Sequence, residues 1–217
     1  MADTKISALA AAGAAAAANE LVINEAGTSK KLTMEQIRDF IAANSGVDNA
    51  AVATQVTGAV DVYVTNSGLL IPNSRLQAKT VARWILSITK STAGTGTPTF
   101  NIRFGTGGVV GDTSRCLFTW PAANTAVADE MEVAITATFR TVGSGTSAVI
   151  EGMLRATHEL TATGFGGTAL GSVIILNTTG GGFDSTVANS ILGLSVNPGT
   201  AGAWSIRQCV GRLDNLQ

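Results

Sequence analysis

Few side chains in this sequence have the chemistry of a catalytic or metal-binding residue, and the single histidine, His158, is the first of them. His158 has the same strand parity as Ile150, Leu154 and Leu160, which places it on an apolar face near a strand end. A general base needs a carboxylate to orient it, and the neighbouring Glu159 points to the opposite face. We therefore expect a hydrogen-bonded structural histidine, with a pH sensor at an interface as the alternative.

The two cysteines, Cys116 and Cys209, are the candidate nucleophiles or disulfide partners. Cys116 is in phase with Phe118 and Trp120 and is predicted to be a small core residue. Cys209 falls in the other phase from the apolar residues before it, so we expect it to face outward with Arg207. Two cysteines do not make a disulfide framework, and the default is reduced thiols in a chain made in the cytoplasm. Whether the two pair stays open.

Acidic residues gather at one place, residues 129–132, where three of four side chains are carboxylic acids. Adjacent acids at the start of a strand point in different directions, so they do not form the matched pair that a glycosidase needs. Asp112 and Asp184 lie in predicted loops without the repeated oxygen ligands of a calcium site. We expect each of them to be solvated or hydrogen-bonded.

Aromatic side chains could form a platform on which a sugar stacks. Trp84 lies in phase with Leu86 and Ile88, and Trp204 lies in phase with Ile206, so both are predicted to pack in the core. The remaining tryptophan, Trp120, stands at a strand end and is the one expected to be exposed.

Two glycine-rich segments, residues 143–148 and 164–169, match the loose dinucleotide pattern GxGxxA. A predicted strand follows each of them, whereas a dinucleotide site needs a helix whose N-terminus receives the pyrophosphate. The sequence contains neither a phosphate-binding P-loop motif nor a GxSxG nucleophile elbow. It therefore predicts a protein that is not an enzyme, with no catalytic residue, no cofactor and no metal ion.

The overall composition narrows the choice of partners. Charged residues make up 13% of the 217 residues, about half the usual share, and the formal net charge is −1. No basic field is available to attract nucleic acid. The apolar stretch of residues 8–18 is too short to span a bilayer, and Asp3 spoils the basic start of a secretory signal. We expect no nucleic-acid partner and no membrane partner.

The elements that position these residues fall into two regions. Residues 1–45 contain a predicted short strand at residues 20–24, a turn at residues 25–28, and a capping box at Thr33 and Gln36. Apolar residues then recur at helical spacing and predict a helix that ends near residues 44–46. Residues 46–59 are small and polar and are predicted to be a linker.

From residue 60 onward the apolar period changes from 3.6 to 2. About nine strands separated by Gly, Thr, Ser, Asn and Pro turns are predicted, without an intervening helix of useful length. The predicted strands cover residues 60–65, 76–90, 100–104, 115–120, 131–140, 148–160, 172–177, 190–196 and 203–213. The sheets should therefore be antiparallel, and we predict a mainly β fold: an antiparallel β-sandwich of jelly-roll type over residues 60–217, with a small α+β module at the amino terminus.

One stretch of this domain points to assembly. Between Leu160 and Trp204 the only charged residue is Asp184, although Gly-rich loops lie within the stretch. Monomeric proteins usually keep their surfaces charged. An uncharged surface of Thr, Gly and Ala favours coverage by neighbouring subunits, with a merely neutral surface as the alternative.

The amino-terminal residues resemble a known module. The sequence runs K-I-S-A-L at residues 5–9, E-L-V at 20–22, T-S-K-K-L-T at 28–33 and Q-I at 36–37. This pattern resembles the module that opens many tailed-bacteriophage structural proteins. The resemblance covers about 40 residues, and the alanine run of residues 14–18 departs from the more varied spacer of that family.

The β domain also looks like the one that follows this module in phage head-fibre, decoration and tail-fibre proteins, notably at residues 97–106, 182–189 and 194–199. The resemblance implies a virion protein, made in the host cytoplasm, that forms a homotrimer. It further implies attachment to the major capsid or another virion protein through the amino-terminal module. The predicted docking residues are Ile6, Leu9, Leu21, Val22, Ile37, Phe40 and Ile41.

Two functions follow from these expectations. The first is a capsid decoration or head-fibre (cement) protein, which the absence of a long repeat or coiled coil favours. The alternative is a short tail-fibre or receptor-binding module that recognises a host-surface glycan. Exposed aromatics and acids in one cleft would favour the second function, and a flat apolar base would favour the first.

Overall fold

The computed structural model of the chain describes residues 20–25, 28–33, 47–48, 55–57, 60–71, 75–166, 171–200 and 203–216. The chain divides into two compact units, residues 1–42 and residues 43–217. The described residues of both units form strands, turns and loops. Within these ranges there is no helix long and apolar enough to cross a membrane.

The first unit contains a β-hairpin. Strand β1 (Glu20–Glu25) pairs antiparallel with β2 (Thr28–Thr33), with Glu20 opposite Thr33 and Glu25 opposite Thr28. The strand predicted at residues 20–24 is present. The second strand was not predicted, because its apolar pattern is weak and its partner supplies the backbone hydrogen bonds that hold it extended. The helix predicted after Thr33 lies outside the described residues.

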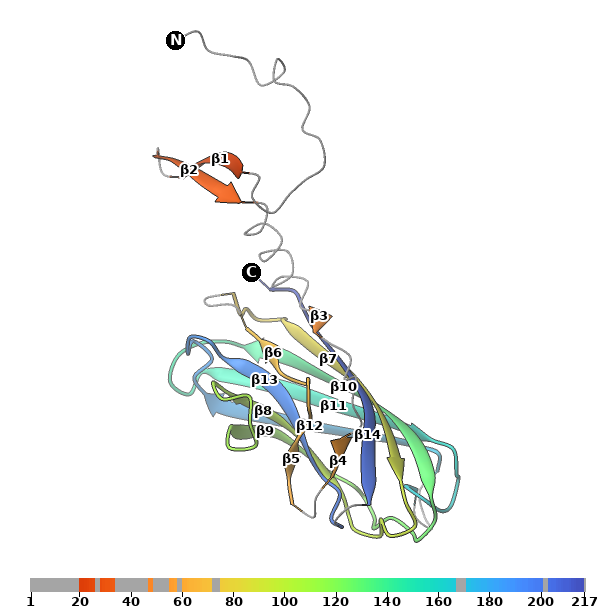
Figure 1. The fold of residues 1–217 in the computed structure, drawn as a ribbon. Helices are drawn as coiled ribbons and strands as arrows, with labels where there is room; N and C mark the ends of the chain where they lie inside the picture. The colour runs from red at the N-terminus through yellow and green to blue at the C-terminus, as the bar shows by residue number, and fades with distance from the viewer. Residues whose placement is uncertain are drawn as a thin grey trace. The chain divides into compact units, whose positions relative to one another are not determined.

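The second unit is an antiparallel β-sandwich (Figure 1). Its short strands are β3 (Val47–Asp48), β4 (Gln55–Val56), β5 (Val62–Tyr63) and β6 (Leu69–Leu70). Its long strands are β7 (Val81–Lys90), β8 (Thr99–Gly105), β9 (Thr113–Thr119), β10 (Asp129–Thr141), β11 (Ala148–His158), β12 (Val173–Phe183), β13 (Ile191–Asn197) and β14 (Trp204–Asp214). The predicted mainly β fold, an antiparallel sandwich, is confirmed.

The strand order explains how the sandwich is connected. The larger sheet has the order β12-β11-β10-β7-β14-β3, with β4 also on β14, and the smaller sheet has the order β5-β13-β8-β9, with β6 also on β13. The chain crosses between the sheets after β4, β6, β7, β9, β12 and β13, and such repeated crossing is a feature of jelly rolls. Strands β10, β11 and β12 form a meander at one side of the larger sheet.

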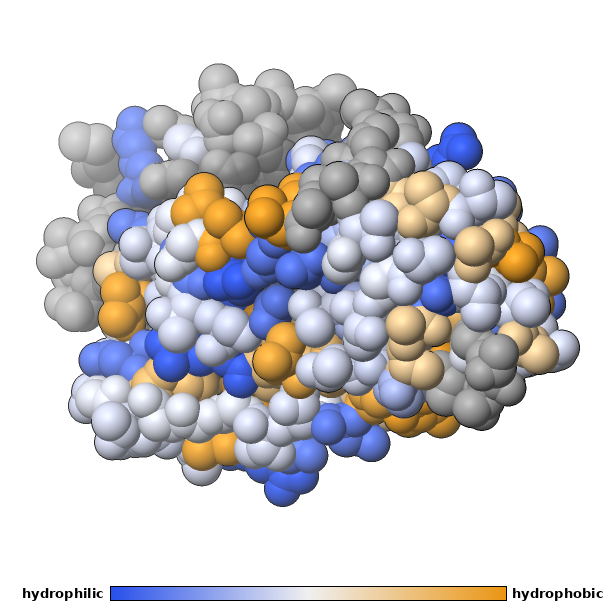
Figure 2. All heavy atoms as spheres, turned by 90° about the horizontal axis from the view of Figure 1, so that it is seen from below, coloured by the Kyte–Doolittle hydropathy of each residue, from blue (hydrophilic) through white to orange (hydrophobic). Residues whose placement is uncertain are grey.

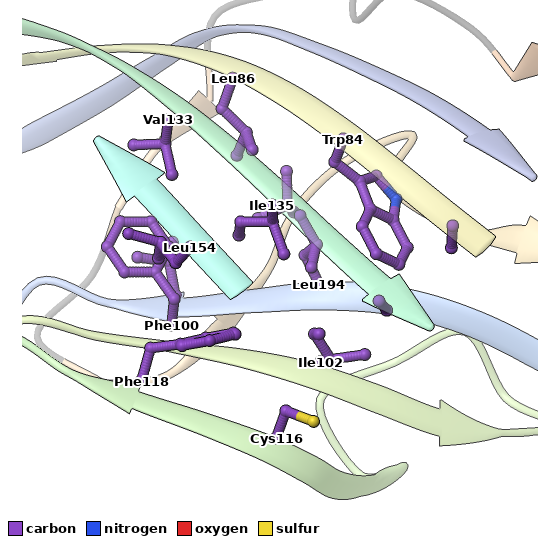
Figure 3. Packing of buried hydrophobic residues seen from close by; sticks show 14 of the residues in the cluster. Trp84, Leu86, Phe100, Ile102, Cys116, Phe118, Val133, Ile135, Leu154 and Leu194 are labelled. Carbon is purple, nitrogen blue, oxygen red and sulfur yellow. The ribbon is translucent and has the colours of Figure 1, made fainter. Parts of the chain in front are cut away.

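The core lies between the two sheets. It is formed by every second side chain of each long strand, because successive side chains of a strand point to opposite faces. Along β10 the buried apolar residues are Met131, Val133, Ile135, Ala137 and Phe139, and the residues between them are more exposed. Figure 3 shows the side chains of one sheet pointing toward those of the other across this layer. Each fully buried aliphatic or aromatic side chain contributes about 1.5–3 kcal/mol to folding.

Two strand edges of the sandwich are covered by residues 47–71. Strands β3 and β4 pair with β14, and β5 and β6 pair with β13. Gln55 links the two edges, because its Nε2 donates to the Tyr63 carbonyl at 2.7 Å and its Oε1 accepts from the Thr65 amide at 2.9 Å. Part of the predicted linker, residues 46–59, is therefore integrated into the larger sheet.

A β-bulge in β14 corrects the prediction for Cys209. The register of β14 against β7 shifts between Ile206 and Gln208, so Arg207 is an extra residue in the strand. Arg207 and Gln208 are both exposed, and Cys209 returns to the core at 0% exposure. The prediction that Cys209 faces outward was wrong, because strict alternation does not allow for an inserted residue.

The prediction that Trp120 is exposed was also wrong. Trp120 is 2% exposed and its Nε1 donates to the Phe165 carbonyl at 2.8 Å. The loop after β11 supplies that carbonyl from 45 residues away along the chain. Trp84 and Trp204 are buried as predicted.

Candidate functional site

The one histidine belongs to a buried polar cluster at one end of the larger sheet. His158 Nδ1 lies 2.9 Å from Asp129 Oδ2, and both side chains are fully buried. His158 Nε2 lies 3.1 Å from the Gly171 carbonyl oxygen. Both ring nitrogens therefore have oxygen partners within the fold, and the side chain is enclosed. The prediction of a hydrogen-bonded structural histidine is confirmed.

Asp129 is the partner that the sequence analysis did not identify. It precedes Met131, which pairs directly with His158 across β10 and β11. Asp129 Oδ2 also accepts from the Phe165 amide at 2.9 Å. Cross-strand register is what brings Asp129 to His158, and no local sequence signal reports register.

Lys90 lies at the same end and ties another loop to the sheet. Lys90 is 3% exposed. Its Nζ donates to the Thr125 and Val127 carbonyls at 2.7 and 2.5 Å. Burial lowers the pKa of Lys90, while the carboxylate of Asp129 opposes that shift. The cluster thus fastens the loops that follow β9 and β11 to the ends of β7 and β10, which is a structural role.

Cys116 and Cys209 form no disulfide, and both are buried within the sandwich core. Cys116 is in the core as predicted, and burial raises its pKa to about 11. A thiol that stays protonated at neutral pH is a poor nucleophile and a poor metal ligand. Both residues occupy positions typical of side chains that pack in the core.

The loop acids are held by backbone amides. Asp112 accepts from the Gly107, Gly108 and Val109 amides at 3.1, 2.7 and 3.3 Å. Asp184 accepts from the amide and the hydroxyl of Thr186, and these hydrogen bonds lower its pKa. Hydrogen-bonded loop acids were predicted and are present. In the part of the chain that the structure describes, no group of three or more His, Cys, Asp or Glu residues could hold a metal ion.

A depression of about 360 Å³ lies between these two acids. Arg115 lines it, with its guanidinium 4.5 Å from the centre of the Phe183 ring. Burial lowers the pKa of Arg115. Both carboxylate oxygens of Asp112 and Oδ1 of Asp184 accept hydrogen bonds from their own turns, and Arg115 is the cationic residue among those that line the depression.

The predicted docking residues can be placed only in part. Leu21 and Val22 lie in strand β1, opposite Leu32 and Lys31 of β2. Ile6, Leu9, Ile37, Phe40 and Ile41 lie outside the described residues. Their role in attachment stays a prediction.

The larger sheet carries exposed apolar side chains on its outer face. Ile175 on β12 is 58% exposed and Val173 is 46% exposed. Met153 on β11 and Ile85 on β7 are exposed to a similar degree, and Ile175 and Ile85 lie in the same cross-strand row. Apolar surface of this kind often marks a contact with another protein.

Charge lies beside this surface on β11, where the exposed Arg155 is directly opposite Ile175. Figure 2 shows an end of the molecule where white and pale-blue residues separate small orange and blue patches. Strand β12 itself contains no charged residue. The uncharged stretch identified in the sequence therefore includes a long strand at the side of the larger sheet, and the surface of this strand is the candidate functional site.

Comparisons with known proteins add little to this geometry. No protein-family model matches the chain, and no curated protein matches it. A solved protein of unknown function from Shewanella oneidensis MR-1 is 10% identical, with a TM-score of 0.30, over 86% of this chain and 96% of that one. A structure of infectious bursal disease virus, Gx strain, is 9% identical, with a TM-score of 0.20, over 87% of this chain and 44% of that one. Neither TM-score is high enough to establish a shared fold.

Proposed function

We propose that this chain is a non-enzymatic structural protein of a tailed-bacteriophage virion, a capsid decoration or head-fibre protein that assembles as a homotrimer. The observation that carries the proposal is the nearly uncharged stretch between Leu160 and Trp204, whose strand β12 leaves Val173 and Ile175 exposed. A monomer gains solubility from surface charge, so a surface without it is suited to being covered by another subunit.

The amino-terminal unit is proposed to be the attachment end. Its residues carry the resemblance to the opening module of phage structural proteins, and residues 1–42 form a compact unit separate from residues 43–217. A separate unit can bind the major capsid protein, or another virion protein, without altering the sandwich. The proposal includes no nucleic acid and no membrane as a partner.

The alternative, a receptor-binding module for a host-surface glycan, has less support. Glycan recognition commonly uses an exposed aromatic ring on which the sugar stacks. All three tryptophans, Trp84, Trp120 and Trp204, are buried in the sandwich. The described part of the chain therefore supports a covered surface better than a sugar-binding cleft.

The test is the position of the protein on purified phage particles. We expect mass spectrometry to find the chain in the particle and gold-labelled antibody to mark the head. We expect residues 43–217 alone to fold and to be missing from particles assembled in their presence. Absence of the full chain from particles would overturn the proposal, and label confined to the tail would overturn decoration in favour of the tail-fibre function.

A further inference from the structure

His158 joins two strands of the larger sheet at one end. It is the last residue of β11, and the loop that follows it leads to β12. Its backbone amide donates to the Ser172 carbonyl at 3.0 Å, and its ring Nε2 lies 3.1 Å from the Gly171 carbonyl oxygen. Gly171 and Ser172 come directly before β12. One residue therefore fastens the start of β12 to the end of β11, through both its backbone and its side chain.

The partner of Nε2 requires a proton on that nitrogen. A backbone carbonyl oxygen accepts hydrogen bonds and has no hydrogen to donate, so Nε2 has to be the donor toward Gly171. A ring nitrogen without a proton would instead place its lone pair 3.1 Å from the lone pairs of that oxygen. The geometry is therefore favourable only when Nε2 carries a hydrogen.

The partner of Nδ1 requires a proton there as well. Nδ1 lies 2.9 Å from Asp129 Oδ2, which also accepts the Phe165 amide. The other oxygen, Oδ1, accepts the Glu130 amide. Amides that donate to both oxygens stabilise the carboxylate over the carboxylic acid, so Asp129 accepts from Nδ1. Because an imidazole ring donates from both nitrogens only as the imidazolium cation, these partners select a buried imidazolium–carboxylate pair.

The charged groups around His158 come from β7, β10 and the residue after β11. Lys90 of β7 is opposite Asp129 in the strand register and disfavours a second cation nearby. Its Nζ donates to three backbone carbonyl oxygens, which stabilise that charge locally. Strand β12 contributes no charged residue. Three carboxylates favour the cation, because they line the same depression of about 360 Å³ as His158: Glu130, Glu132 and Glu159.

We propose that His158 is a pH-dependent latch: as a cation it holds residues 171–172 against the end of β11, and loss of its proton releases the contact with Gly171 and loosens the start of β12. A neutral ring has one N–H and can serve only one of its two oxygen partners. Hydrogen bonds to a charged acceptor are the stronger ones, so the ring keeps Asp129 and loses the carbonyl. The inference uses the sandwich alone and does not depend on a role in the virion.

The direction of the pH dependence follows from the proton that the folded state holds. Because folding favours the protonated ring, the free energy of unfolding falls as the pH rises through the titration of that ring. Histidine is the side chain that titrates nearest to neutral pH, and the chain has no second histidine. Stabilisation by the latch is therefore present in mildly acid solution and lost in mildly alkaline solution.

The first test follows urea unfolding of the full chain across pH, detected with the tryptophans, all three of which are buried in the sandwich. We expect the folded-to-unfolded ratio of the wild type to fall about 10-fold from pH 6 to pH 9. His158→Asn keeps an amide donor for Asp129 but cannot titrate, so its ratio should change much less. Glu132→Gln, which removes an exposed carboxylate of the same depression, should keep most of the wild-type fall. A wild type no more pH-dependent than His158→Asn would overturn the latch.

The second test counts the ring protons and needs no variant. Because His158 is the one histidine of the chain, labelled histidine gives the two ring-nitrogen signals of this residue alone in nitrogen-15 NMR. At pH 7 we expect both nitrogens to be protonated. As the pH rises and Nε2 loses its proton, we expect the His158 amide, which donates to Ser172, to exchange faster after correction for base catalysis. A neutral ring at pH 7, or a titration that leaves this exchange unchanged, would overturn the proposal.

Discussion

His158 Nδ1 lies 2.9 Å from Asp129 Oδ2 in a site where neither side chain is exposed. The same carboxylate oxygen accepts the Phe165 amide at 2.9 Å. Gly164 allows this approach, because a Cβ atom there would lie 2.1 Å from Asp129 Oδ2 and its φ of +69° favours glycine. One carboxylate thus holds a strand end and a loop together.

Removal of this carboxylate should destabilise the sandwich strongly. Asp129→Ala leaves the His158 nitrogen and the Phe165 amide without their partner, and breaking a buried pair of this kind costs about 3–5 kcal/mol. Urea unfolding followed by circular dichroism measures the change. Glu132→Ala, at an exposed position of the same strand, should change stability by less than about 0.5 kcal/mol. Equal effects of the two substitutions would contradict a structural role for the pair.

His158 and Asp184 should not be required for function beyond their effect on folding. We expect His158→Ala and Asp184→Ala to bind particles in proportion to the fraction of folded protein, since His158 is enclosed and Asp184 caps a turn. Competition with wild-type protein for particles measures this. A loss of binding by a fully folded variant would point to a functional site that contains the residue.

The boundary between the units predicts different results for two truncations. Deletion of residues 1–42 should leave the melting temperature of the sandwich unchanged, because it removes only the first compact unit. Deletion of residues 1–59 also removes β3, β4 and the Gln55 link to Tyr63, and should lower the melting temperature by roughly 5 °C or more. Calorimetry of both proteins provides the comparison. Identical melting temperatures would show that the β14 edge needs no cover.

Two glycines of neighbouring segments should respond differently to a methyl group. In Gly180→Ala the new Cβ would overlap the Arg115 carbonyl, a backbone group with little freedom to move, and the cost should be about 1–3 kcal/mol. In Gly171→Ala the Cβ would meet nothing within 4 Å, and stability should change by less than about 0.5 kcal/mol. Chemical denaturation of the two variants checks the close approach of β9 and β12.

Neither cysteine thiol should react with a thiol reagent while the protein is folded. Burial raises the pKa of Cys116 to about 11, so at pH 8 the reactive thiolate is scarce, and the core excludes the reagent. Cys209 is buried as well. We expect no reaction with a chromogenic disulfide reagent in buffer and two equivalents in denaturant. One fast equivalent in buffer would place Cys209 on the surface, where strict alternation had put it.

The predicted attachment helix can be tested although it lies outside the described residues. Phe40→Ala should cost a few kcal/mol if the ring is buried in the contact, and Phe40→Asp should cost more because it buries a charge. Arg38→Ala, on the opposite side of the predicted helix, should change binding by less than about 0.5 kcal/mol. Particle occupancy in competition with wild type is the measurement. Equal tolerance at the two positions would show that this stripe is not the contact.

The sequence alone determined the alternation of the long strands. Residues 131, 133, 135, 137 and 139 are buried because each successive side chain of a strand points to the opposite face, and that rule needs no knowledge of neighbours. The same rule located Trp84 and Cys116 in the core. The charge-free character of β12 is likewise a property of the residues themselves.

Only the tertiary structure decided how strands meet. The bulge at Arg207 turned Cys209 inward, a distant loop covered Trp120, and cross-strand register brought Asp129 to His158. Each of these depends on a partner far along the chain, and local periodicity contains no information about which partner is chosen. The position of β12 at the end of its sheet was decided in the same way: hydrogen-bond pairing between strands made an uncharged segment into an exposed edge.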